Sequence, residues 1–499
     1  MKKFLSILMC IAVVFTMAVP VFAANVDYAI TNPYDDVDWN TYNTYKADLH
    51  SHTNASDGGN TLSEMIERHY ELGFDIHAIS DHGTTSYSWT KPNYAPVVKL
   101  ICMVRKGKSS VEYLDEKGTA SNGKAYSVDT VNGDDYYTQE DGQSMLRVPF
   151  ANEQNPTSFN NAHVNTWFVD YGNDRIGGTS DYETVIKAVD ELGGVSVINH
   201  PGEYTSARDE VYTADAYNKS DIFYNYYIDK FENLLVNYKS CLGIDINSKG
   251  DARTRFDRKL WDTMLTDVAP TGRNIYAIAS TDAHNLDIAN SGYVMTVMPE
   301  NTSAALKSCL LSGNFFAQSC YIGNVDELQA YATGLLASDN ETAKTLGATM
   351  QETVDTINTE ISENGKQGTR FKFAENATCV TVNAISVDDE NDIISIDASD
   401  ALYIRWISDG KVVAEGASID LNACENIGSY VRAEIISEGA VTYTQAFLLN
   451  YTGMPEADVN ENFTDFGGFV SGICDTLVRA LGSVIGTFAD SILNMMGVV

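Results

Sequence analysis

Residues 47–59 read ADLHSHTNASDGG, which places His50 and His52 two positions apart and follows them with the turn Ser56-Asp57-Gly58. Alternate residues of a β-strand point to the same face, so both imidazoles can bind one ion if this stretch ends a strand. The pattern therefore predicts a metal site at the carboxyl end of a strand.

Four further segments each contain a histidine, and two of them also contain an aspartate. Most of these segments follow an apolar or β-branched run. They are AISDHG at 78–83, NNAHVN at 160–165, VINHPG at 197–202 and STDAHN at 280–285. With the first segment they contain six of the eight histidines, whereas His69 and His77 fall outside the motifs and are predicted to be core or hydrogen-bonded residues. Imidazoles and carboxylates in this number predict a site for several metal ions.

From residue 46 to about 324, short apolar runs alternate with helical patterns, as an α/β fold requires. Helical spacing at 62–72 precedes a strand-like run at 76–79, for example. Residues 105–145 break this rhythm, and their Gly, Asp, Ser and Tyr content predicts a loop-rich insertion. The insertion would lie over the site or decorate the surface.

The other segments have patterns of their own. Residues 24–45 are polar and aromatic and are predicted to be a lead-in that packs on the first domain. Residues 325–367 predict a helical connector, and 368–450 predict a small β-sandwich-like domain, because alternating strands recur between turn signals. Residues 466–499 predict an amphipathic helix, too often interrupted by charge to span a membrane. That helix would dock on its own protein, self-associate or touch the cell surface.

Composition limits the location and the partners. Residues 1–23 combine Lys2 and Lys3 with an apolar stretch and a small-residue cleavage site, which predicts a secretory signal and an exported protein. The net formal charge of −35 becomes two units more negative once those lysines are removed. Such a surface repels phosphate backbones, so no binding of duplex nucleic acid is expected. Bound divalent ions would reverse the charge locally and leave small phosphoesters as substrates.

The cysteines are scattered along the chain and form no CxxC pair, which argues against a cysteine zinc site. A disulfide framework is not predicted, although Cys309–Cys320 or Cys379–Cys424 remain open as isolated bridges.

In their order, the histidine motifs resemble those of the PHP (polymerase and histidinol phosphatase) family of metal-dependent phosphoesterases. Residues 48–53 with 56–58 match its opening signature, 80–82 its second and 280–284 its last, with one Thr in place of the usual neighbour. Glu153, His163 and the pair His200-Pro201 match the family's bridging glutamate and the two histidines that follow it. The resemblance spans about 46–324, and the β-rich segment 368–450 resembles exported members more loosely.

The resemblance implies a distorted (β/α)7 TIM-like barrel with two or three divalent ions, Zn, Mn or Fe, at its mouth. Nine side chains would hold these ions in three sets: His50, His52, Glu153 and Asp282; Glu153, His163 and His200; and Asp57, His82 and His284. Glu153, Asp282 and His284 would also take part in catalysis. Asp48 and Asp81 would orient imidazoles from the second shell.

The sequence thus predicts a secreted phosphoesterase that uses a metal-activated hydroxide, with 5′–3′ exonuclease or nucleotide phosphatase activity included. Arg208 and Lys249 are the cations predicted to contact the substrate phosphate. Two alternatives stay open. One is an amidohydrolase-like C–N or C–O hydrolase on a similar barrel, and the other is a non-catalytic surface-binding protein.

Overall fold

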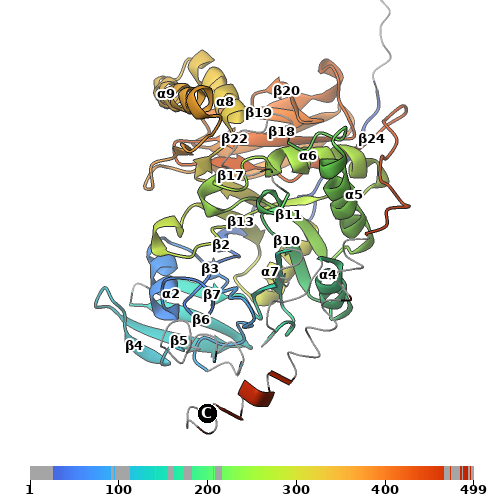
Figure 1. Ribbon diagram of the computed structural model, residues 1–499. Helices are drawn as coiled ribbons and strands as arrows, with labels where there is room; N and C mark the ends of the chain where they lie inside the picture. The colour runs from blue at the N-terminus through green and yellow to red at the C-terminus, as the bar shows by residue number, and fades with distance from the viewer. Residues whose placement is uncertain are drawn as a thin grey trace, which may run out of the picture.

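The computed structural model describes residues 26–465 except 92–94, 96–99, 101–112, 141, 155–161, 174–181, 206 and 208–215, with isolated positions beyond 465. The predicted signal, Arg208 and most of the predicted helix at 466–499 therefore lie outside the described residues. The described chain is a mixed α/β structure with a large β-rich part (Figure 1).

The segment that carries the first motif forms β2 (Asn43–Asp48), α2 (Leu62–Glu71) and β3 (Ile76–His77). β2 runs parallel to β3, which runs parallel to β7 (Ser144–Arg147). α2 begins at a capping box in which Thr61 and Glu64 satisfy each other's backbone N–H groups. It buries Met65 and Ile66 on one face, so the predicted helix at 62–72 is confirmed.

A second sheet has the order β12-β11-β10-β9-β8. Its strands are β8 (Asn152–Gln154), β9 (Val164–Trp167), β10 (Val195–Ile198), β11 (Cys241–Asn247) and β12 (Tyr276–Ala279). β10, β11 and β12 are parallel, whereas β8 and β9 pair in antiparallel fashion. The helices α4 (Tyr182–Glu191), α5 (Ile222–Asn237) and α6 (Asp257–Val268) share the main apolar core with β10 and β11. Burial on both faces explains why these strands read as continuous apolar runs.

Isolated backbone contacts connect the two sheets near the motifs. The N–H of Glu153 donates to the carbonyl of Ser80 (2.9 Å), and the N–H of His52 donates to the carbonyl of Ala283 (2.9 Å). The strands that lead into the motifs nevertheless lie in two separate sheets of mixed direction, the sheet that carries β2 and the sheet from β8 to β12, so closure into one seven-stranded barrel is not shown. The α/β character is confirmed, and the barrel remains a prediction.

The predicted loop-rich insertion contains regular structure instead. β4 (Lys117–Thr119), β5 (Ala125–Val131) and β6 (Asp134–Gln139) continue the first sheet beyond β7 as antiparallel strands. They project from the body of the molecule in Figure 1. These strands were not predicted because only one residue of β5 is buried, so its sequence shows no alternation of apolar and polar residues.

The connection from the site to the C-terminal part runs through β13 (Gly292–Met298), α7 (Ser303–Ser312), β14 (Phe315–Ser319) and β15 (Tyr321–Ile322). Two helices follow where a helical connector is predicted, α8 (Val325–Ala337) and α9 (Glu341–Asn364). Leu328, Tyr331 and Leu335 of α8 lie in the same buried cluster as residues of the C-terminal strands.

The C-terminal strands form two layers around a second core. One layer contains β17 (Thr381–Asp388), β18 (Ile393–Ser399) and β21 (Ser418–Asp420). The other contains β19 (Tyr403–Ser408), β20 (Lys411–Glu415), β22 (Tyr430–Ile436), β23 (Val441–Tyr443) and β24 (Phe447–Asn450). β23 pairs with β14, so the second layer is continuous with the sheet that carries β2. The short β16 (Phe371–Lys372) pairs with β15.

The lead-in contacts the first domain, where Tyr34 stacks on Phe316, but it also packs on the C-terminal strands. β1 (Ala29–Thr31) pairs with β24, and Tyr28, Tyr34 and Val37 join the core of the C-terminal strands. A short segment of mixed polar and aromatic residues carries no signal for its partner, because the partner strand lies more than four hundred residues away.

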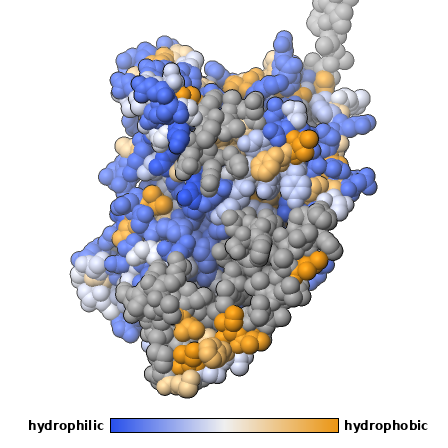
Figure 2. Space-filling view, viewed as in Figure 1, coloured by the Kyte–Doolittle hydropathy of each residue, from blue (hydrophilic) through white to orange (hydrophobic). Residues whose placement is uncertain are grey.

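Cys309, Cys320, Cys379 and Cys424 are free thiols, so neither isolated bridge left open above is present. None of the helices in the described part of the chain combines the length and the apolar content of a membrane-spanning helix. Hydrophilic residues cover most of the coloured surface in Figure 2, as the composition leads us to expect.

Candidate metal centre

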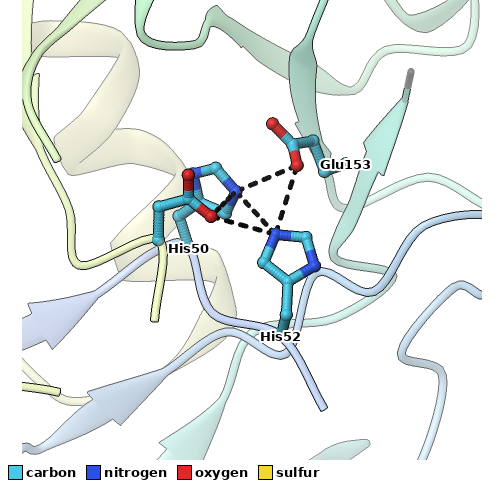
Figure 3. Close-up of side chains that lie close together, drawn as sticks. His50, His52 and Glu153 are labelled. Atoms are coloured by element: carbon cyan, nitrogen blue, oxygen red, sulfur yellow. Dashed lines mark hydrogen bonds and ion pairs between the residues drawn. The ribbon is translucent and has the colours of Figure 1, made fainter. Parts of the chain in front are cut away.

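The first motif brings two imidazoles together just beyond β2. The Nε2 atoms of His50 and His52 lie 3.0 Å apart. Both face Oε2 of Glu153, at 3.3 and 3.2 Å, and Oδ1 of Asp282, at 3.4 and 3.2 Å. All four side chains are fully buried, and their potential ligand atoms lie within 4.8 Å of one another. Figure 3 shows the two rings and the Glu153 carboxylate converging on one point.

Glu153 lies between two groups of histidines. Its Oε2 faces His50 and His52, and also His82 at 3.5 Å. Its Oε1 faces Nδ1 of His163 at 2.9 Å and Nε2 of His200 at 3.1 Å. The Asn199 side chain donates to the same Oε1 at 2.7 Å. Each oxygen of one carboxylate therefore serves a different histidine group.

A third group lies toward solvent. Oδ2 of Asp57 is 3.1 Å from Nε2 of His284 and 3.8 Å from Nε2 of His82. The Asp57 side chain is 41% exposed, so this group is the most open part of the site. The turn that carries Asp57 requires a glycine, because a Cβ at Gly58 would lie 2.7 Å from the carbonyl oxygens of His52 and Thr53.

Burial controls the charge of these groups. It lowers the pKa of His82 to about 4 and that of His200 to about 3, so both imidazoles are neutral at pH 7 and can act as ligands. Burial opposes the charge of Asp282, but Lys249 and His50 hold the pKa of its carboxyl well below its usual range. Burial opposes the charge of His52 as well, but its contacts with Asp282 and Glu153 raise its pKa well above the usual value. Imidazoles beside ionised, buried carboxylates form a donor set that suits a divalent cation.

Two of these residues have left-handed backbone angles. The φ of His200 is +27° and that of Asp282 is +43°. Non-glycine residues in this region cost roughly 1–3 kcal/mol each and are concentrated at functional sites. Both follow buried strands, β10 and β12, whose ends aim the side chains inward.

The predicted role of Asp48 and Asp81 needs correction. Asp81 accepts hydrogen bonds from the N–H of Thr53 (2.7 Å) and the hydroxyl of Ser56 (2.6 Å), and Asp48 accepts them from His69 (2.9 Å) and the hydroxyl of Thr281 (2.5 Å). These contacts are therefore with α2 and with the loops that carry the candidate ligands, not with the ligand imidazoles. Such loop contacts fix where the ligands sit.

His69 and His77 are buried outside the centre, as predicted. Their rings stack with centroids 3.7 Å apart, and His77 contacts the hydroxyl of Ser51 at 2.8 Å.

A cavity of about 480 Å³ opens onto the centre. Lys249, one of the two predicted phosphate-binding cations, lines it, with Nζ 2.9 Å from Oδ2 of Asp282. Arg208, the other, lies outside the described residues. All nine predicted ligand side chains lie in or against the three groups described above.

Three further residues line this cavity. Glu203 pairs with Lys249 at 3.0 Å and also with Arg253, and the hydroxyl of Tyr204 lies 2.9 Å from Nε2 of His163. A carboxylate three residues after His200 has no distinctive spacing, so the sequence alone does not place Glu203 in the site. The turn η1 (Pro201–Glu203) brings it back over the site.

Comparisons with known proteins give distant structural neighbours. No family model matches the chain, and no curated protein matches it. One solved neighbour is a two-domain protein from Bacteroides vulgatus ATCC 8482 containing a predicted PHP-like metal-dependent phosphoesterase. It has a TM-score of 0.34 and 12% identity, over 88% of this chain and 97% of that chain.

Two others align over 54% of this chain. PsfC from Pseudomonas syringae PB-5123 has a TM-score of 0.30 and 14% identity over 88% of its own length. The lesion-specific endonuclease PfuEndoQ from Pyrococcus furiosus has a TM-score of 0.28 and 12% identity over 56% of its length. The neighbours thus include a PHP-like phosphoesterase, and the His/Asp/Glu cluster is compatible with a PHP metal site. At these scores the likeness assigns no activity, so function has to be argued from the side chains.

Proposed function

We propose that this chain is an exported metal-dependent phosphoesterase of the PHP type, with two or three divalent ions, Zn, Mn or Fe, in the described centre. The observation that carries the proposal is the position of Glu153, whose two carboxylate oxygens face two separate groups of histidines. A carboxylate in this position is suited to bridge two cations.

The donor sets fit such ions. His50, His52, Glu153 and Asp282 would hold the first ion, and Glu153 with His163 and His200 would hold the second. Asp57, His82 and His284 would hold a third in the more exposed group. The carboxylates of Asp282 and Glu153 are fully buried, and Lys249 pairs with Asp282 at 2.9 Å. A bound divalent ion would add positive charge beside both carboxylates and so reduce the cost of burying them.

Bound ions would supply Lewis-acid stabilisation of phosphoryl oxygens and lower the pKa of a water toward about 7. The chain's own side chains have defined parts in this chemistry. Lys249 and Arg253, both lining the cavity, present positive charge to a phosphate entering from solvent. Glu203 pairs with both and holds them in place. Tyr204 hydrogen-bonds His163 and fixes the ring whose other nitrogen faces Glu153.

The substrate proposed is a small phosphate ester or a short nucleotide. The proposal includes 5′–3′ exonuclease activity at the end of a short oligonucleotide. Support comes from the cavity of about 480 Å³, which is the size of a small-molecule site. The net charge of −35 disfavours long polyanions. Export remains a proposal based on the sequence of residues 1–23.

The test is a substrate panel with the purified chain lacking residues 1–23. Release of phosphate from aryl phosphates, nucleoside monophosphates or short oligonucleotides, abolished by chelation and restored by Zn²⁺, Mn²⁺ or Fe²⁺, is expected. Release of ammonia or a carboxylate from amides and lactones without release of phosphate would instead identify an amidohydrolase-like enzyme. Turnover that survives Asp282→Ala would contradict the assignment of the centre.

A further inference from the structure

Lys249 extends toward the metal centre from a turn with left-handed backbone angles. β11 ends at Asn247, and the turn η2 (Lys249–Asp251) follows. Lys249, Gly250 and Asp251 have φ angles of +50°, +60° and +56°, so three successive residues are left-handed. Only the glycine adopts this conformation readily, and the other two persist where the surrounding structure holds them.

Asp251 holds one end of this turn. Its carboxylate is fully buried and accepts hydrogen bonds from Oγ1 of Thr254 (2.9 Å) and Nη2 of Arg258 (2.8 Å). The backbone N–H of Gly323 also donates to it. These contacts come from α6 and its preceding loop and from the start of the C-terminal part.

Arg370 holds the other end. It lies between α9 and β16, and its Nη1 donates to the carbonyl oxygens of Lys249 (3.1 Å) and Gly250 (2.5 Å). Its guanidinium also lies 5.6 Å from the centre of the Tyr321 ring. A Cβ at residue 250 would be 3.2 Å from the same Nη1, so the glycine lets the guanidinium approach the backbone.

The side chain of Lys249 points from this turn into the centre. Its Nζ lies 2.9 Å from Oδ2 of Asp282 and 3.0 Å from Oε2 of Glu203. The side chain is 21% exposed, so the amine is held in place and remains accessible from the cavity. The position of the amine therefore depends on the backbone of the turn from which the side chain extends.

We infer that Arg370 is a positioning residue, which fixes the backbone of Lys249 and Gly250 and so places the Lys249 amine against Asp282. The segment after α9 is then part of the working site. The kinetic consequence rests on the proposed function, but the structural consequence can be measured without any turnover.

The structural test measures how fast the Lys249 amine is acetylated by an N-hydroxysuccinimide ester, read by peptide mass spectrometry. Arg370→Ala is expected to raise that rate severalfold, and Arg370→Lys, which can still donate to a carbonyl, to raise it less. Arg68→Ala is the matched control, because it removes an arginine from an ion pair with Glu375 at the surface. Lys46 is half-buried, with its amine bonded to the carbonyl of Leu72 and to Asn290. Its acetylation monitors general loosening and is expected to stay constant.

An unchanged Lys249 rate in Arg370→Ala would overturn the inference, as would an equal rise at Lys46. If Arg370→Ala does not fold, Arg370→Gln keeps more of the side-chain volume and serves the same comparison.

The kinetic test is a double-mutant cycle with Lys249→Ala and Arg370→Ala, using p-nitrophenyl phosphate. Misplacement by about 1 Å can cost up to ~100-fold, and we expect Arg370→Ala to lower kcat/KM by roughly tenfold or more. The double variant is expected to lose no more than Lys249→Ala alone. Losses that multiply would show that Arg370 acts elsewhere and would overturn the inference. If the wild-type chain hydrolyses no phosphoester, the proposed function fails, and the acetylation rates still decide the positioning role.

Discussion

The Nε2 atoms of His50 and His52 face each other at 3.0 Å in a fully buried site. Both also face the same oxygens of Glu153 and Asp282. Two imidazole nitrogens aimed at one point, with carboxylates around it, form a cage for a cation more readily than a hydrogen-bond network.

Replacing a ligand of this cage is expected to remove metal and activity together. Substitution of outer-shell partners typically costs 10–100-fold in metal affinity, so Asp282→Asn, which changes a ligand itself, is expected to cost at least ~100-fold. Elemental analysis after dialysis and phosphate release are the measurements. Asp287→Asn, on the nearby exposed turn η4 (Leu286–Ile288), is the control and is expected to match the wild type. Full metal content in Asp282→Asn would rule out its role as a ligand.

Glu153→Gln is expected to affect more than one ion, because its two oxygens serve two histidine groups. The amide keeps the shape but loses the charge and presents an N–H₂ group to one group of histidines. We expect metal content to fall by more than one equivalent per chain. Glu203→Gln, in the same cavity but paired with Lys249, is expected to keep its metal. A loss of one equivalent or less in Glu153→Gln would contradict the bridging position.

The metal-free protein is expected to lose stability as the pH falls below about 6.5. Burial lowers the pKa of His200 to about 3 and that of His82 to about 4, whereas an unfolded histidine titrates near 6.5. Below pH 6.5 the unfolded state therefore binds protons that these two histidines do not bind in the folded state. Their contribution to stability is complete above pH 6.5 and declines toward pH 3–4. Denaturant unfolding of chelator-treated protein at several pH values measures this slope. His200→Gln is expected to flatten it, and an unchanged slope would show that His200 is not buried neutral.

Glu232 is expected to have the opposite dependence. Burial, and then the nearby Asp267, raises the pKa of its carboxyl to about 10. A carboxyl with a raised pKa contributes most below the unfolded value near 4.3, and that contribution is lost as the pH rises toward 10. Glu232→Gln is expected to be more stable than wild type at pH 9 and similar at pH 4, by denaturant midpoint. Glu352→Gln on the exposed face of α9 is expected to change neither. A loss of stability at pH 9 would disprove the buried, protonated state.

A buried ion pair joins the two parts of the fold. Arg432 of β22 donates to Asp262 of α6 through Nε (2.8 Å) and Nη2 (2.7 Å), and it also pairs with Glu434. Removing one partner of such a pair costs about 3–5 kcal/mol, so Asp262→Ala is expected to lower the free energy of unfolding by about that amount. A single shared transition monitored by tryptophan fluorescence and circular dichroism is expected for the wild type. A change below about 1 kcal/mol would show that this contact does not hold the parts together.

The sequence was most informative where a predicted strand is followed by histidine and carboxylate side chains. The pairs His50 with His52 and Asp282 with His284 could be recognised because each follows an apolar run at a spacing of two residues. Glu153 needed the family resemblance, since one glutamate after a short strand carries no pattern. Turns bring Glu203, Tyr204 and Arg253 to the site. The geometry of these turns depends on tertiary contacts, so no local sequence pattern predicts it.

The fold was predictable to a similar degree. The helix at 62–71 and the buried strands 195–198 and 276–279 follow from apolar periodicity. The strands β4 to β6 have polar faces, and β1 pairs with β24 across the whole chain, so neither pairing is encoded in local sequence. Direction and closure of the sheets depend on such long-range contacts, so local sequence does not determine whether the expected barrel closes.

Anomalous diffraction from crystals of the full chain grown with Mn²⁺ or Zn²⁺ tests the metal centre most directly. The expected result is a peak within coordination distance of His50, His52 and Asp282, and a second peak across Glu153 beside His163 and His200. Ordered crystals with millimolar metal and no anomalous peak at these side chains would contradict the metal centre, and with it the proposed hydrolase.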